Sequence, residues 1–178
     1  SDRNTLVNNE IIGNDVTGIM LQPSGHNKIL QNLIIGNLAE GILITNAVGR
    51  DQQNLISDNY FENNQNVRLQ EGGNPNYIWN ESISPGTNII GSAILGGNVW
   101  TNPKGSGFSQ MCQDQDGNGI CDLPYSVMPG NIDEHPLKYS GPSIIPEDLR
   151  NIGVGFEPVT ANDWVTEGKI LMGSSDYD

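Results

Sequence analysis

Positive charge is scarce in this sequence. The 178 residues include 8 Lys and Arg against 21 Asp and Glu, which gives a net charge of −13 at pH 7. A surface that binds nucleic acid needs clustered Lys and Arg to contact phosphates, so the composition excludes nucleic acid as a partner. An acidic surface is typical of extracellular proteins that stay soluble at high salt or bind cations.

Long apolar runs are also missing. No stretch approaches the roughly 20 apolar residues that a membrane-spanning helix needs, so we expect no membrane span. The chain begins at Ser1 without a signal peptide, and we therefore expect a mature form or a piece of a longer protein. Its length is sufficient for one substantial core plus a tail.

Cysteine is limited to two residues, Cys112 and Cys121. In a secreted protein such a pair predicts a disulfide that closes a small ring, whereas in a reducing cell the two residues would stay free thiols. The spacing is not that of a CxxC pair, and no His lies near enough in sequence to indicate a zinc site. We predict the disulfide.

An acidic loop lies within and just beyond this ring. Oxygen-bearing side chains alternate along it, and Gly119 stands where calcium loops of the EF-hand type turn sharply. The twelfth position is Tyr125 instead of a bidentate Glu, so the last ligand must come from elsewhere, with Asp133 and Glu134 as candidates; a solvated acidic turn is the alternative. We predict calcium as the cofactor, with ligands from Asp114, Asp116, Asn118, Ile120 through its carbonyl, Asp122 and Asp133.

The first seventy residues contain an internal repeat. Residues 9–14 (NEIIGN) recur as residues 32–37 (NLIIGN) and, in degenerate form, as residues 59–64. Each copy has three short segments with apolar residues at every second position, which predicts strands. The aligned apolar positions are Leu6, Ile29 and Ile56; Ile11, Ile34 and Phe61; and Ile19, Ile42 and Val67.

Three strands per turn, stacked turn on turn, describe a right-handed parallel β-helix. We therefore predict an all-β fold with β-helix turns in residues 1–100, a calcium-loop cap in 101–139 and a linker with an irregular, extended tail in 140–178. Asn at the corners should form hydrogen-bonded ladders. The N-terminal end shows no cap, so we expect possible partners there to include a second copy. An outward apolar row indicates a contact surface for the tail or a partner: Ile12, Met20, Ile35 and Leu43.

Four motifs occur in the order of a known family: residues 85–91 (PGTNIIG), 96–100 (GGNVW), 114–122 (DQDGNGICD) and 131–137 (NIDEHPL). The chain resembles the NosD-like, or CASH-type, right-handed β-helix repeat proteins, especially the secreted and cell-surface members of methanogenic archaea. The resemblance implies a pectate-lyase-like solenoid, an extracellular or cell-surface location and carbohydrate as the usual ligand. The family's namesake is linked to copper-site maturation, but the methionines are too scattered to indicate a copper site: Met20, Met111, Met128 and Met172.

Catalytic patterns are weak. A glycosidase needs two facing carboxylates, and the candidates are Glu10 and Glu62, which we expect to point outward about 9–10 Å apart, two turns of the stack. A solvated acidic face is the alternative, and no catalytic Ser/His/Asp triad can be identified in the sequence. Trp100 is expected in the core or as a ring that stacks on sugar.

We predict a non-catalytic extracellular module that binds polysaccharide or cell-surface glycan, or serves as an envelope scaffold. The alternatives are a fragment of a polysaccharide hydrolase or lyase, and a self-assembling filament or adhesin subunit.

Overall fold

The computed structural model describes residues 2–45, 53–70 and 75–146. Nearly all regular structure in these ranges is strand, which confirms the all-β prediction. The repeats contain β1 (Thr5–Val7), β2 (Glu10–Ile12), β3 (Thr17–Leu21), β4 (Lys28–Leu30), β5 (Leu33–Ile35), β6 (Glu40–Ile44), β7 (Leu55–Ser57), β8 (Tyr60–Glu62) and β9 (Val67–Leu69). Then follow β10 (Ser84–Pro85), β11 (Ile94–Leu95), β12 (Val99–Thr101), α1 (Phe108–Met111), β13 (Tyr125–Met128) and β14 (Asn131–Asp133).

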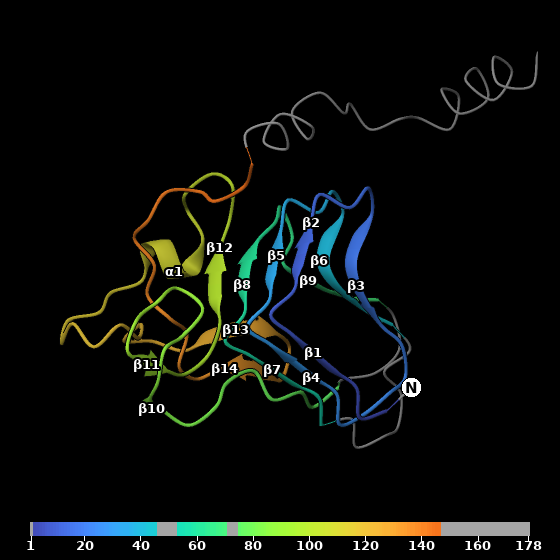
Figure 1. The fold of residues 1–178 in the computed structure, drawn as a ribbon, viewed down its shortest axis with the longest axis horizontal. Helices are drawn as coiled ribbons and strands as arrows, with labels where there is room; N and C mark the ends of the chain where they lie inside the picture. Colours follow the sequence, from blue (N-terminus) through green and yellow to red (C-terminus); the bar gives the residue numbers. More distant parts are fainter. Residues whose placement is uncertain (1, 46–52, 71–74, 147–178) are drawn as a thin grey trace, which may run out of the picture.

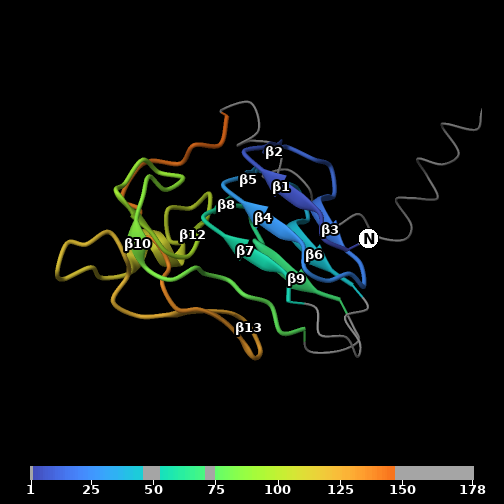
Figure 2. The same cartoon turned by 60° about the horizontal axis from the view of Figure 1, so that its bottom comes forward.

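Corresponding strands of successive repeats pair in parallel. They form three sheets, β1-β4-β7, β2-β5-β8-β12 and β3-β6-β9, and Figure 1 shows the second of these with its four strands side by side. Figure 2 shows β1, β4 and β7 in the same stacked relation. The registers join the three predicted sets, Leu6 with Ile29 and Ile56, Ile11 with Ile34 and Phe61, and Ile19 with Ile42 and Val67, so the predicted alignment is confirmed.

The alternating apolar residues meet in a core between the three sheets. Ile34, Ile42, Ile56 and Phe61 each have 0% of their surface exposed. Trp100 of β12 is 1% exposed, and its ring stacks on Phe61 with centroids 4.6 Å apart. Trp100 is therefore a core residue, and its ring face is not free to stack on a sugar.

Asparagine ladders run along the corners, as predicted. The central one joins Asn9, Asn32, Asn59 and Asn98, and each residue donates its backbone N–H and its Nδ2–H to Oδ1 of the next. The residues that precede the first three have φ of 54° to 56°, the left-handed region that tight corners need: Asn8, Gln31 and Asp58.

Glycine allows another asparagine ladder to pass close to the backbone. This ladder joins Asn14, Asn37 and Asn63. A Cβ on Gly18 would lie 2.9 Å from Nδ2 of Asn37, and one on Gly41 would lie 2.7 Å from Nδ2 of Asn63. The recurrence of glycine at these two positions in the repeat therefore has a steric cause.

The hairpin of β13 and β14 ends the central ladder and supplies a second buried acceptor beside it. Asp133 accepts the backbone N–H of Asn98 at 2.8 Å, in the place where an asparagine oxygen would continue the central ladder. Asn131 accepts the backbone N–H of Tyr77 and the indole N–H of Trp79. Both acceptors are buried, so these hydrogen bonds are shielded from water.

A second core covers the outer face of the sheet β2-β5-β8-β12. Its buried members are Ile35, Tyr60, Val99, Ile120, Leu137 and Ile145. Residues 140–146, expected to be a linker, contribute Ile145, and Tyr139 packs edge-on against Tyr60 with centroids 5.2 Å apart. Of the predicted outward row, Ile12 and Ile35 are thus covered within the chain and Met20 is 54% exposed; the rest of the predicted tail, residues 147–178, lies outside the described residues.

Candidate functional site

A disulfide holds the acidic loop beside this second core. Cys112 and Cys121 are bonded, with Cα atoms 5.6 Å apart, which confirms the prediction. Ile120, next to the bond, is 5% exposed and pairs with Leu137. One side of the loop is therefore fixed to the protein, and the other faces solvent.

Three predicted ligands come together in the loop. The carboxylates of Asp114, Asp116 and Asp122 offer oxygens that all lie within 4.8 Å of one another. Asp114 accepts the N–H groups of Gly119 at 2.9 Å and Asn118 at 3.0 Å. Desolvation alone would raise the pKa of Asp114, but these hydrogen bonds outweigh it and hold the pKa below its usual range. The loop therefore keeps Asp114 ionised.

The other predicted ligands are placed differently. Oδ1 of Asn118 accepts the N–H of Ile120 at 2.8 Å. Asp133 does not belong to the cluster of three aspartates. Its Oδ2 accepts hydrogen bonds from Asn98 and Trp100, and its Oδ1 accepts the N–H of His135 at 3.1 Å. Burial raises the pKa of Asp133 to about 6, against the opposing effect of these bonds. Asp133 thus terminates a ladder inside the protein.

The carboxylates considered for catalysis do not face each other. Glu62 pairs with Ile35, which pairs with Ile12, so Glu62 is offset by two residues from Glu10. Glu62 is 0% exposed, and the prediction that it points into solvent is wrong. The reason is the second core: Ile144 donates its N–H to Glu62 at 3.0 Å. No pair suited to glycoside hydrolysis is formed by these two residues.

A hollow that we did not predict lies near α1. Its volume is about 390 Å³. Side-chain amides line one part of it and aromatic rings the other, and among the described residues no Asp, Glu, Lys or Arg takes part in the lining. The amides are Asn63, Asn64, Gln65, Asn66 and Asn102, and the rings are Trp100, Phe108 and Tyr125.

Several polar groups in this amide-and-aromatic pocket are free to bind a ligand. Asn64 and Gln65 are exposed, and within the described ranges their side chains make no hydrogen bond to the protein. Tyr125 is half-buried, burial raises its pKa, and its hydroxyl therefore stays protonated. Its ring centroid lies 4.9 Å from that of Phe108. The sequence does show the run of amide residues at 63–66. The pocket could not be predicted from it, because α1 and β13 lie far from this run in the sequence.

Comparison with known proteins identifies the family. Residues 1–105 match the family model described as "Periplasmic copper-binding protein (NosD)", and this is more than half of the 178 residues. The chain belongs to the NosD family. Membership, expected from the sequence motifs, is confirmed, and it indicates a periplasmic or extracellular β-helix module. No curated protein and no solved structure matches the chain, and the described residues include no helix long and apolar enough to cross a membrane.

The NosD description corrects the cofactor prediction. It names copper, so the prediction of calcium is wrong. The described residues nevertheless do not fit a copper site. Copper prefers clustered thiolate, thioether or imidazole ligands, but both cysteines are in the disulfide. Among the described residues, the one group of Asp, Glu, His or Cys side chains close enough to hold a metal ion consists of three aspartates. We therefore derive no chemistry through copper.

Proposed function

We propose that the chain is a non-catalytic periplasmic or extracellular module that binds an uncharged glycan in its amide-and-aromatic pocket. The pocket itself carries the proposal. Amide groups both donate and accept hydrogen bonds, as sugar hydroxyls require, and Tyr125 combines an apolar ring with a hydroxyl. The described residues of its lining carry no charged side chain, which favours a neutral ligand, because an ionic ligand would need a charged partner.

The proposed architecture is a right-handed parallel β-helix with turns in residues 1–100, a disulfide-stabilised cap in 101–139 and a tail beyond. Parallel strands joined by crossovers are right-handed in about 98% of known cases. The central ladder ends on Asp133, and Asn131 accepts the N–H of Tyr77; both contacts support the assignment of the β13–β14 hairpin to a cap. In this arrangement the pocket lies where the last turn meets the cap.

A module of this kind needs no catalytic pair. The geometry of Glu10 and Glu62 supports the non-catalytic proposal, because one is exposed and the other is enclosed by residues 139–145. The competing proposal of a polysaccharide hydrolase or lyase would need carboxylates or bases at the pocket, and the described part of the lining supplies none.

The test is binding of neutral polysaccharides by isothermal titration calorimetry, with released oligosaccharides followed by mass spectrometry. We expect saturable binding without cleavage. Tyr125→Phe, which removes only the hydroxyl, and Gln65→Ala should each weaken binding about threefold to tenfold, since one hydrogen bond contributes roughly 0.5–1.5 kcal/mol. Asn76→Ala changes an exposed amide outside the pocket and serves as the control. Binding unaffected by both pocket variants would exclude this pocket, released products would indicate an enzyme, and neither binding nor cleavage would leave a scaffold.

We also propose that Asp114, Asp116 and Asp122 bind one divalent cation, with Asn118 and the carbonyl of Ile120 as further donors. Three carboxylates within 4.8 Å repel one another, and a cation would offset this repulsion.

Titration with Mn(II), which accepts oxygen ligands, should show one site that Asp116→Asn weakens at least tenfold. Asp15→Asn, an exposed acid outside the loop, is the matched control. Parallel titration with Cu(II) tests the ion that the NosD description names. If neither ion binds at the loop, the loop is only a solvated acidic turn.

A further inference from the structure

Strand β9 has an edge that no other strand covers within the described residues. It lies at one end of the sheet β3-β6-β9. Asn66 accepts an N–H of β6, and Gln70 donates its own N–H to a carbonyl of β6, so both residues bond toward the preceding turn. Successive residues of a strand bond to opposite sides, and Val67 therefore directs its N–H and C=O away from β6. Neither group bonds to a described residue.

This free edge borders the amide-and-aromatic pocket. Val67 takes part in the lining, together with Phe108 of α1 and with Tyr125 and Val127 of β13. All four side chains pack against the main core and are only half-buried. The pocket therefore combines a backbone N–H that is available to a ligand with apolar surface that the core leaves uncovered.

The hydroxyl of Tyr125 is a second polar group that the pocket offers. It makes no hydrogen bond to a described residue, and it does not belong to the buried side-chain atoms that lack a partner, which are Oγ1 of Thr45 and Oε1 of Glu62. It is therefore accessible to a ligand. A protonated phenol oxygen both donates and accepts hydrogen bonds. The pocket thus offers a donor from β9 and an acceptor from β13.

An amide group matches this pair. The N–H and C=O of a planar trans amide point in opposite directions, so an amide ligand needs a donor on one side and an acceptor on the other. A whole peptide strand does not fit between β9 and β13. Their Cα atoms approach within 8 Å, whereas a strand inserted between two others needs about 9.6 Å, twice the spacing of paired strands. A single amide group on a small ligand is thereby favoured.

We infer that the glycan bound here contains N-acetylated amino sugars and that the pocket recognises their acetamido group; the inference rests on the proposed glycan binding. The acetamido carbonyl accepts the N–H of Val67, and its N–H donates to the hydroxyl oxygen of Tyr125. Its methyl group contacts Phe108 and Val127. Ring hydroxyls bond to the free side-chain amides of the pocket. The acetamido group is uncharged, as the described lining favours, whereas a uronate or a free amino sugar would bring an unpaired charge.

Two oligosaccharides separate this inference from glycan binding in general. Chitotetraose and cellotetraose are tetramers of the same linkage that differ only in an acetamido group or a hydroxyl at the second ring carbon. By isothermal titration calorimetry with the full chain, we expect chitotetraose to bind at least tenfold more tightly. Equal affinities, or tighter binding of cellotetraose, would overturn the inference while glycan binding stands. If neither binds, the inference falls, and the other neutral polysaccharides decide glycan binding separately.

Hydrogen exchange identifies the recognising group. Saturating chitotetraose should slow exchange at the amide of Val67 at least tenfold, whereas the amide of Leu69, which faces the same way outside the pocket, is the internal control and should not change. Val67→Pro removes the N–H and should weaken chitotetraose binding about threefold to tenfold, the effect of one hydrogen bond. Proline is tolerated on an edge strand whose N–H faces outward; if the variant nevertheless unfolds, the exchange measurement decides. No slowing at Val67, or equal slowing at Leu69, would overturn the inference.

Discussion

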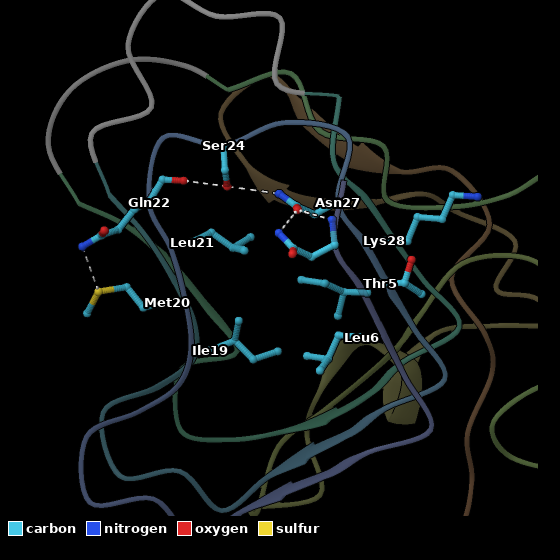
Figure 3. Close-up of a pocket in the computed structure, with 11 residues that line it drawn as sticks. Thr5, Leu6, Ile19, Met20, Leu21, Gln22, Ser24, Asn27 and Lys28 are labelled. Atoms are coloured by element: carbon cyan, nitrogen blue, oxygen red, sulfur yellow. Dashed lines mark hydrogen bonds between the residues drawn. The ribbon is translucent and has the colours of Figure 1, made fainter. Parts of the chain in front are cut away.

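The two ends of the β-strand stack differ in how they satisfy the same backbone. At the C-terminal end, Asp133 supplies the acceptor that ends the central ladder, Asn131 accepts the N–H of Tyr77, and Trp79 and Trp100 are buried in the apolar core. Among the described residues at the N-terminal end, the first asparagines of the ladders are exposed and Leu6 and Ile19 line a hollow (Figure 3). The repeat therefore specifies how turns join, and a different sequence, that of the β13–β14 hairpin, ends the central ladder.

We expect local stability to differ between the first turn and the later turns. Turns that are covered on both sides exchange donors and acceptors with two neighbours, whereas the first turn does so with one. In stacked repeats each unit is stabilised mainly by its neighbours. We therefore expect the first turn to open more readily than the third, and equal substitutions at the two places to have unequal effects.

The largest expected difference concerns two asparagines of one ladder. Asn59 is 0% exposed, and its Nδ2 donates to Asn98 and to the carbonyls of Ile29 and Ser57. Asn59→Ala leaves several buried groups unpaired, at roughly 1–3 kcal/mol each, so we expect a total loss of at least about 3 kcal/mol in the free energy of unfolding. Asn9→Ala, at the exposed start of the ladder, should cost less than about 1 kcal/mol.

Chemical denaturation of both variants beside the wild type measures this difference. Asn59→Asp, which keeps the acceptor oxygens but replaces the donating amide, separates loss of donors from loss of the whole side chain. Equal costs at Asn9 and Asn59 would mean that the first turn is as well supported as the third, contrary to the contrast between the ends.

The repeats were predictable because alternation, corner asparagines and glycine spacing are all local signals. The registers of Ile29 with Ile56 and of Ile34 with Phe61 followed from them. The disulfide was predictable from two cysteines alone. In the candidate site, alternation brought Asp114, Asp116 and Asp122 together, as expected.

Other features depended on contacts between distant segments. Glu62 alternates with apolar residues and was expected outside in water, but residues 139–145 bury the outer face of its sheet. Asp133 was predicted as a ligand from its acidity and its position after the loop, whereas its environment is the end of a ladder begun far earlier in the chain. The amide-and-aromatic pocket is lined by residues 63–66 together with residues of α1 and β13, and no local sequence pattern predicts that these segments lie side by side.

The smaller expected effect tests why a charged residue ends a neutral ladder. Burial raises the pKa of Asp133 from 3.8 to about 6, so the folded protein holds this proton more tightly than the unfolded chain does. The resulting stabilisation is complete below pH 3.8 and is lost as the pH rises through about 6. The shift corresponds to about 3 kcal/mol between these limits.

Asp133→Asn removes the titration while keeping an acceptor for Asn98 and Trp100. The difference in unfolding free energy between wild type and variant, measured from pH 4 to pH 8, should therefore shift toward the variant by up to about 3 kcal/mol. Taking this difference cancels the other carboxylates, whose repulsion also weakens at low pH. A difference independent of pH would show that Asp133 titrates alike in both states, and the closed end would then be stabilised by its hydrogen bonds without a penalty for burying the charge.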